Sequence, residues 1–161
     1  MTEDMDRYHR VETECPAFQA RVTARALTRY YNASFRPLGI TAEQFSLLVG
    51  IGGSHEPTVT ELAVRAGVDA TTLSRNVKGL EERGLVHGHG GQGRAGKRLV
   101  LTRRGTRLME ESMAIWEGAR GKLAEALGEE TSRAAANAMS QLAVAAQVAA
   151  ETLSSADSPA A

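Results

Sequence analysis

The sequence predicts a mainly α-helical chain that carries one small β-hairpin. Hydrophobic residues make up 42% of the chain and aromatic residues only 4%, and an Ala- and Leu-rich composition with scattered charges favours helices over a β-sandwich. Two short apolar segments on either side of the Gly-rich stretch 89–96 indicate the hairpin. With 161 residues, the chain suits one domain or two closely joined lobes.

The first 35 residues are expected to hold a charged segment and a long helix. Residues 1–13 are interpreted as a frayed arm or as a short helix that needs a partner to dock on. A helix over 16–35 follows, because the missing N–H of Pro16 costs nothing in a first helical turn. The apolar stripe of this helix consists of Phe18, Val22, Ala26, Tyr30 and Phe35.

Three short capped helices are predicted between residues 41 and 83. Capping boxes open the first two, Thr41 with Gln44 and Thr58 with Glu61. Gly67 supplies a tight turn, and Asp69 caps the third helix. The residues expected in the core are Phe45, Leu48 and Val49 of the first helix and Leu73, Val77 and Leu80 of the third.

The hairpin and two longer helices are expected to complete the chain. Segments 84–88 and 97–102 are the predicted strands. A helix over 102–127 carries the apolar residues Leu108, Met113, Ile115, Trp116 and Leu123. The final helix, 131–153, is apolar on most of its surface, which predicts packing against a second subunit. The tail 154–161 is expected to be disordered.

The charge distribution points to a polyanionic partner. The net charge of the whole chain is zero, but residues 58–107 hold ten basic and four acidic side chains, which is +6 (10 − 4). The remaining residues carry nine basic and fifteen acidic side chains, or −6 (9 − 15). A basic middle segment within an otherwise acidic chain is typical of nucleic-acid binding.

Several other classes of protein are not expected. No stretch reaches the roughly 18 apolar residues of a membrane span, and the N-terminus lacks a signal peptide, so a cytoplasmic protein without membrane contact is predicted. No paired-carboxylate, Ser-His-Asp or Cys-His arrangement has credible spacing, which argues against an enzyme, and no cofactor is expected. His87 and His89 form a His-x-His pair, but two ligands do not make a zinc site.

Taken together, a helix, a tight turn at Gly67, a second helix with a basic face and a hairpin form a winged helix-turn-helix arrangement. The segments "RPLGITAEQFSLL", "TVTELAVRAGVDATTLSRNVKGLEERGLV" and "RLVLTRRG" resemble the MarR family of bacterial transcriptional regulators, over roughly residues 15–150. The resemblance implies a homodimer. Its dimerisation region would be residues 15–36 and 103–153, and its DNA-binding lobe residues 41–102.

By this resemblance, the two lobes would read a pseudo-palindromic operator in double-stranded DNA. Thr71, Thr72 and Ser74 at the start of the recognition helix can bind phosphates or base edges. Arg75 is predicted to read a guanine and Lys78 to contact phosphate. At the wing, Arg94 would enter the minor groove, while Lys97 and Arg98 would hold the DNA backbone; the alternative for these three is a solvated hairpin tip.

The wing departs from the family at one position. The family usually carries Asp two residues before the wing arginine, whereas this chain has Gln92. The family Asp is thought to brace the wing. The replacement, among several glycines, therefore suggests a looser wing and weaker minor-groove specificity.

The sequence contains two candidate sites for sensing a signal. Cys15, the only cysteine, begins the first long helix, where the positive helix end and Arg21 would favour a thiolate. One branch of the family senses organic hydroperoxides through a cysteine at this place; the alternative is an inert thiol. A pocket for a small aromatic or carboxylate effector is predicted from Cys15, Phe18, Arg21, Phe45, Met113 and Trp116, and the alternative is that its apolar members are core.

Three functions follow as hypotheses. The leading one is a homodimeric repressor that a small-molecule effector releases from DNA. The second is a thiol-based redox-sensing repressor that acts through Cys15. The third is a winged-helix protein-interaction module without specific DNA binding, against which the charge of the middle segment argues.

Overall fold

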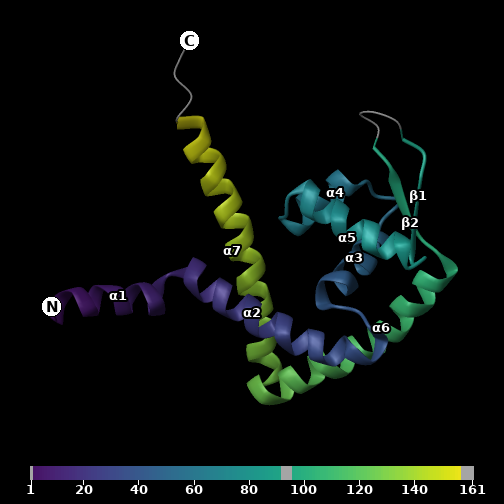
Figure 1. Ribbon diagram of the computed structural model, residues 1–161. Helices are drawn as coiled ribbons and strands as arrows, with labels where there is room; N and C mark the ends of the chain where they lie inside the picture. Colours follow the sequence, from purple (N-terminus) through teal and green to yellow (C-terminus); the bar gives the residue numbers. More distant parts are fainter. Residues whose placement is uncertain (1, 92–95, 157–161) are drawn as a thin grey trace, which may run out of the picture. The chain divides into compact units, whose positions relative to one another are not determined.

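The computed structural model describes residues 2–91 and 96–156. Its elements are α1 (Thr2–Glu14), α2 (Pro16–Phe35), η1 (Arg36–Leu38), α3 (Ala42–Gly52), α4 (Val59–Ala66), α5 (Ala70–Glu82), β1 (Val86–His89), β2 (Arg98–Leu101), α6 (Arg103–Leu127) and α7 (Glu129–Ala156). The chain divides into one unit of Met1–Leu27 with Arg120–Ala161 and another of Thr28–Ala119. The mainly α fold with a two-stranded hairpin confirms the predicted class (Figure 1).

The helix boundaries in the second unit follow from local capping, as the sequence predicts. The side chains of Thr41 and Thr58 accept hydrogen bonds from the backbone N–H three residues on, and both capping boxes are complete. Gly67 ends α4 in the left-handed region at φ 64°, which a residue without a Cβ adopts freely. Asp69 caps α5. The N-caps Thr41, Thr58 and Asp69 therefore fix where α3, α4 and α5 begin.

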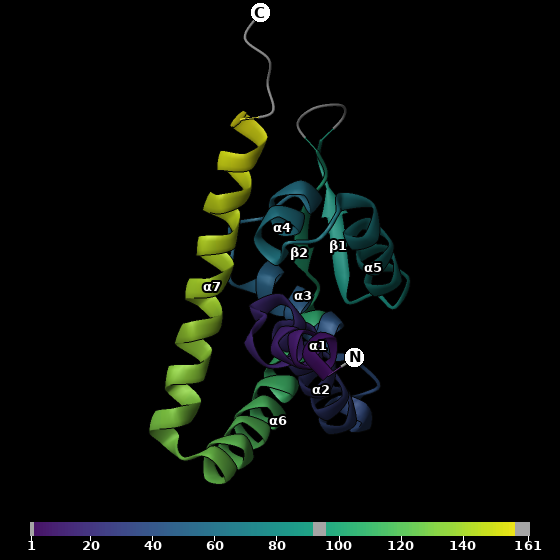
Figure 2. The same ribbon diagram turned by 90° about the vertical axis from the view of Figure 1, so that its left-hand side faces the viewer.

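The hairpin is short and antiparallel. Val86 pairs with Leu101 and His89 with Arg98. Backbone contacts attach β2 to the loop before α4, because Leu99 N donates to Pro57 O at 3.0 Å. In Figures 1 and 2 the hairpin lies beside the α4–α5 pair, with α5 packed on β1 and α3 on β2.

The main core of this unit lies between the three short helices and the hairpin. Its buried members are Leu47, Leu48, Ile51, Leu62, Ala63, Leu73, Val77, Leu80, Leu85, Val86 and Leu99. The expectation for Leu73, Val77 and Leu80 is confirmed. The expectation for Val49 is wrong, since this side chain is 40% exposed and Leu47 is buried. The buried arc of α3 is centred between Leu48 and Ile51, and Val49 falls outside it.

A smaller core cluster forms where α2 ends. Phe35, Ile40 and Phe45 are buried together, and the rings of Phe35 and Phe45 are 4.6 Å apart between centroids. Of the predicted α2 stripe only Phe35 is buried. Val22 is 46% exposed.

The first turn of α6 lies close to the backbone that leads into the hairpin. Thr102 Oγ1 donates to Gly84 O at 2.7 Å and accepts from Gly105 N at 3.0 Å. A Cβ at Gly105 would lie 1.9 Å from the carbonyl oxygen of Leu85. Only glycine fits at this position without a backbone shift.

In the first unit, α7 leaves large apolar side chains in solvent. Those exposed by roughly half or more are Met139, Leu142, Val144, Val148 and Leu153. The helix starts two residues earlier than predicted and ends at Ala156, three residues into the segment expected to be a tail. Residues 157–161 lie outside the described part of the chain. No described helix has the length and apolar character needed to cross a membrane.

Candidate nucleic-acid interface

The exposed face of α5 is the central feature of the candidate interface. Because Leu73, Val77 and Leu80 are buried, the helical period turns the residues between them outward. Thr71, Thr72, Ser74, Arg75 and Lys78 are all exposed. The structure therefore brings the predicted recognition residues onto one accessible helix face.

Thr72 also has a structural role that the sequence prediction does not include. Its backbone N–H donates to Asp69 Oδ1 at 2.8 Å and its hydroxyl donates to Asp69 Oδ2 at 2.6 Å. The hydrogen bonds from the Thr72 side chain and backbone lower the pKa of Asp69 below its ordinary value. The hydroxyl of Thr72 is thus committed to the start of α5, whereas those of Thr71 and Ser74 have no partner among the described residues.

Arg75 and Lys78 differ in how strongly the protein holds them. Within the described chain, Arg75 is exposed and forms neither an ion pair nor a hydrogen bond. Lys78 Nζ lies 3.8 Å from Glu82 Oε1, and both side chains are largely exposed. A pair of this kind contributes little energy, so both cations are available to a phosphate or a base.

The two wing cations that the structure describes, Lys97 and Arg98, form hydrogen bonds within the protein. Lys97 Nζ donates to Glu81 Oε1 at 2.6 Å, which joins the residue before β2 to the C-terminal turn of α5. Arg98 Nη1 donates to Glu56 O at 3.0 Å, which joins β2 to the loop after α3. These contacts hold the loop end of the hairpin, where Arg98 pairs with His89. Arg94 and Gln92, on which the wing predictions rest, lie outside the described residues.

Two contacts that hold α5 were missed by the sequence reasoning. Asn76 Nδ2 donates to Glu43 Oε1 at 2.6 Å, and Arg83 Nη1 donates to Gln44 Oε1 at 3.2 Å. The partners are 33 and 39 residues apart in the chain. No local pattern could have indicated them, because each pair depends on how α3 and α5 cross.

The histidine pair lies on β1. The rings of His87 and His89 stack at 6.4 Å between centroids, as alternation along a strand requires. His89 Nε2 is 3.4 Å from Glu56 Oε2. Over residues 2–91 and 96–156, no cluster of three or more potential metal ligands is found.

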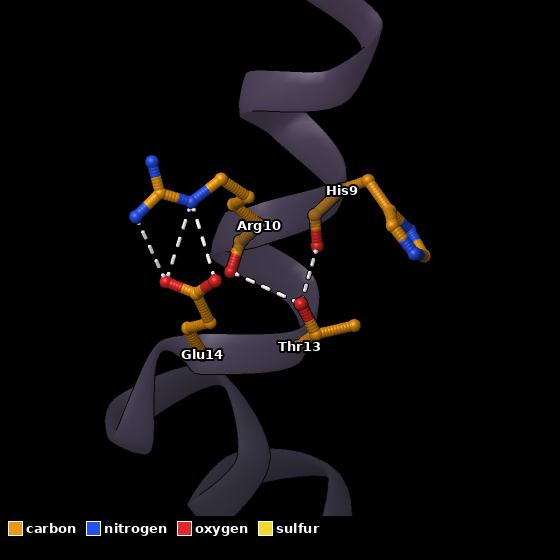
Figure 3. A network of polar contacts seen from close by, with 4 residues as sticks. All are labelled: His9, Arg10, Thr13 and Glu14. Carbon is orange, nitrogen blue, oxygen red and sulfur yellow. Dashed lines mark hydrogen bonds and ion pairs between the residues drawn. The ribbon is translucent and has the colours of Figure 1, made fainter.

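Cys15 lies at the junction of α1 and α2 and is half-buried. It lines an open cavity of about 330 Å³ together with Arg7, Arg10, Val11 and Glu14. The cations beside the thiol therefore come from α1, whereas Arg21 does not line this cavity. Arg10 is itself bound to Glu14, with Nη2 3.0 Å from Oε2 (Figure 3).

The residues predicted for an effector pocket do not line one described cavity. Phe45 is buried, and Met113 and Trp116 pack on the same small core cluster. Phe18 and Arg21 belong to the other unit, and of the whole set only Cys15 lines either described cavity. In this structure the apolar members Phe45, Met113 and Trp116 have a core role.

Comparison with known proteins agrees with this geometry. The model of the MarR family matches residues 38–95, the segment from the end of η1 into the wing. The HTH-type transcriptional regulator YwoH of Bacillus subtilis is 30% identical over 93 residues, which are 58% of this chain and 68% of YwoH.

Solved structures extend the similarity over more of the chain. The M. tuberculosis transcriptional regulator MosR, crystallised in complex with DNA, is 34% identical; the match covers 82% of this chain and 99% of MosR with a TM-score of 0.67. A MarR family protein of Mycobacterium tuberculosis in complex with p-aminosalicylic acid shares the fold at 22% identity, with a TM-score of 0.62 over 80% of this chain and 98% of that one.

The exposed basic helix, the wing and these similarities lead to the same class, and the family resemblance read from the sequence is confirmed. The relatives are described as regulators of transcription. The chain belongs to the MarR family and is a winged-helix, DNA-binding transcriptional regulator.

Proposed function

We propose that the chain acts as a homodimeric repressor that binds a specific operator and is released by a small-molecule effector. The observation that carries the proposal is the exposed face of α5, where Arg75 is accessible and without a partner among the described residues. A planar guanidinium can grip a guanine with two hydrogen bonds in the major groove. Ser74, Thr71 and the positive end of α5 would bind the flanking phosphates.

The assignment of roles within α5 follows from side-chain chemistry. Arg75 reads the base, because its rigid fork matches the guanine edge. Lys78 is a mobile point charge and contacts phosphate. Lys97 and Arg98 position the wing through Glu81 and Glu56 and reach the DNA backbone only through their remaining donors.

The apolar surface of α7 supports a dimer. At about 100° per residue, Met139, Leu142 and Leu153 fall within about 60° of one another, while Val144 and Val148 lie on the opposite side. A helix that is apolar on both sides is stable when other helices surround it. A second copy of the chain supplies such helices, and α7 of each protomer would then be covered by the partner.

A twofold dimer predicts the form of the operator. The two α5 helices would enter successive major grooves about 34–36 Å apart, so the half-sites form a pseudo-palindrome. The related structure with p-aminosalicylic acid supports an aromatic carboxylate as the class of effector. Binding of effector and of DNA must weaken each other by the same factor.

Fluorescence anisotropy with DNA from upstream of the gene tests the proposal. The purified chain is titrated against this duplex and against a random duplex of equal length at several salt concentrations. We expect specific binding of a dimer and a steep loss of affinity with salt. Equal affinity for both duplexes would contradict the proposal and favour a protein-interaction module.

A second candidate, a thiol-based redox repressor, is favoured by one observation: Cys15 lines an open cavity with Arg7 and Arg10. An organic hydroperoxide would oxidise the thiolate to a sulfenic acid and be reduced to the alcohol. The test adds stoichiometric hydroperoxide to the anisotropy titration. Loss of binding that Cys15→Ser prevents would support this candidate, and binding indifferent to peroxide would exclude it.

A further inference from the structure

Gly88 lies within β1 at a position where its own backbone does not require glycine. Gly90 and Gly91, which follow β1, have φ values of 63° and 62°, in the left-handed region that favours glycine. Gly88 does not have a positive φ, and it pairs with Leu99 in the regular antiparallel register. A glycine inside a strand often marks a place where another group approaches closely. The reason for this glycine should therefore lie in its surroundings.

The side chain of Lys97 occupies the space that a side chain at Gly88 would need. A Cβ at Gly88 would lie 2.7 Å from Cδ and 2.8 Å from Nζ of Lys97, and closer still to Cε. Lys97 comes two residues before the buried Leu99 and therefore points to the same face of the hairpin. Gly88 is its diagonal neighbour on the opposite strand, within reach of a long side chain. The lysine thus crosses β1 directly over the glycine.

The crossing ends at a carboxylate on the recognition helix. Lys97 Nζ donates to Glu81 Oε1 at 2.6 Å. Glu81 comes one helical turn after the buried Val77, and only 26% of its side chain is exposed. The neighbouring Glu82 is 67% exposed and lies 3.8 Å from Lys78. Because charges that are partly shielded from water interact more strongly, the pair of Lys97 and Glu81 is the stronger of the two.

The loop end of the hairpin is held from two sides. On one side, Arg98 Nη1 donates to Glu56 O at 3.0 Å, and His89 Nε2 lies 3.4 Å from Glu56 Oε2. On the other side, the bond from Lys97 to Glu81 is the side-chain hydrogen bond that joins the hairpin to α5 among the described residues. A two-stranded hairpin is only marginally stable by itself. Contacts to its neighbours therefore decide where its loop end lies.

We propose that Gly88 and Glu81 are positioning residues of the wing: Gly88 leaves the path across β1 open, and Glu81 binds the lysine that follows this path. The crossing holds the hairpin against α5, so that the recognition helix and the wing meet DNA as one body. A wing that is already in place loses less conformational freedom on binding. The effect on DNA deepens the proposed operator binding and rests on it.

Gly88→Ala interrupts the crossing and leaves every charge in place. The new methyl group would meet only the flexible end of the Lys97 side chain, so this side chain moves and the backbone does not. Alanine also suits a strand better than glycine does, an effect that Gly88→Ala in a Lys97→Ala background measures alone. The difference between the two backgrounds isolates the crossing.

Hydrogen exchange of the backbone amides of β1 and β2, followed by NMR on the full chain without DNA, tests the crossing itself. Glu81→Gln should speed this exchange by about 1.5- to 5-fold, the range for a pair near the surface. Glu82→Gln removes the same charge from the next residue and should leave exchange unchanged. Gly88→Ala should be less protective by the same factor when Lys97 is present than in the Lys97→Ala background.

Fluorescence anisotropy with operator DNA tests the consequence for binding. Glu81→Gln and Glu82→Gln each remove one negative charge at the same end of α5, so their general electrostatic effects cancel in the comparison. We expect Glu81→Gln to bind the operator about 2- to 30-fold less tightly than Glu82→Gln, with two pairs broken in a dimer. Circular dichroism confirms that each variant is folded.

Three results would overturn the proposal. The first is equal hydrogen exchange in Glu81→Gln and Glu82→Gln, and the second is an effect of Gly88→Ala that does not depend on Lys97. The third is operator binding by Glu81→Gln that is as tight as that of Glu82→Gln or tighter, which would mean that a free Lys97 serves DNA better than a held one. If the exchange results are as expected but the unsubstituted chain does not prefer operator to random DNA, the crossing stands and the repressor function fails.

Discussion

Replacing Arg75 with alanine should remove sequence preference rather than binding itself. Arg75 is exposed and has no partner within the described residues, so the substitution breaks no contact inside the protein and leaves Leu73 and Val77 buried. All of its effect should therefore be on DNA. A lost bidentate contact to guanine costs about 1–3 kcal/mol of discrimination, or roughly 5- to 150-fold, at each half-site. In a symmetric dimer the two half-sites double the free energy.

Lys78→Ala is the matched control on the same helix. Lys78 is held only by an exposed contact of 3.8 Å to Glu82, so its removal also leaves the fold intact. A phosphate contact changes the slope of log K against log salt by about 0.9, or about 1.8 for a dimer. Specific and random duplexes should lose affinity alike.

Both variants are measured by anisotropy on operator and random duplexes from about 50 to 200 mM salt. Arg75→Ala should lower affinity for the operator far more than for random DNA. If it weakens both duplexes equally, Arg75 contacts phosphate and the assignment of base readout is wrong. If Lys78→Ala leaves the salt slope unchanged, Lys78 does not contact DNA.

Three further predictions concern the fold and the assembly. Gly105→Ala should lower the free energy of unfolding by about 1–3 kcal/mol, because the new Cβ would lie 1.9 Å from Leu85 O. Gly118→Ala on the same helix is the control: its Cβ meets nothing within 4 Å, and it should raise the free energy of unfolding by about 0.5–1 kcal/mol. Urea denaturation measures both changes. The pKa of Asp69 is lowered below its ordinary 3.8 by hydrogen bonds from Thr72, so its ionised cap stabilises the fold above that value and is lost as the pH falls through the folded pKa. Asp69→Asn should therefore flatten the loss of stability in acid, and an unchanged pH profile of the urea midpoint would contradict this. Leu142→Glu should shift the chain towards monomer in analytical ultracentrifugation, while a dimer of undiminished stability would show that this face of α7 is not the interface.

Local features of the sequence determined most of the winged-helix unit. The caps at Thr41, Thr58 and Asp69 appear where predicted, because a capping box depends on residues only three positions apart. The buried face of α5 also follows from its own period. The exposed basic face could thus be located from the chain alone.

Tertiary structure decided which of those basic residues are free. In the sequence, Lys97 and Arg75 are both predicted to contact DNA, yet Lys97 is paired with Glu81 and Arg75 has no partner in the described chain. The difference depends on how β2 lies against α5, which no local pattern encodes. The cluster of Arg83, Arg104 and Arg107 at one cavity likewise joins the ends of two helices that are separated by the hairpin. Helical periodicity and capping depend on residues a few positions apart, whereas ion pairs between elements depend on how those elements pack in the folded chain.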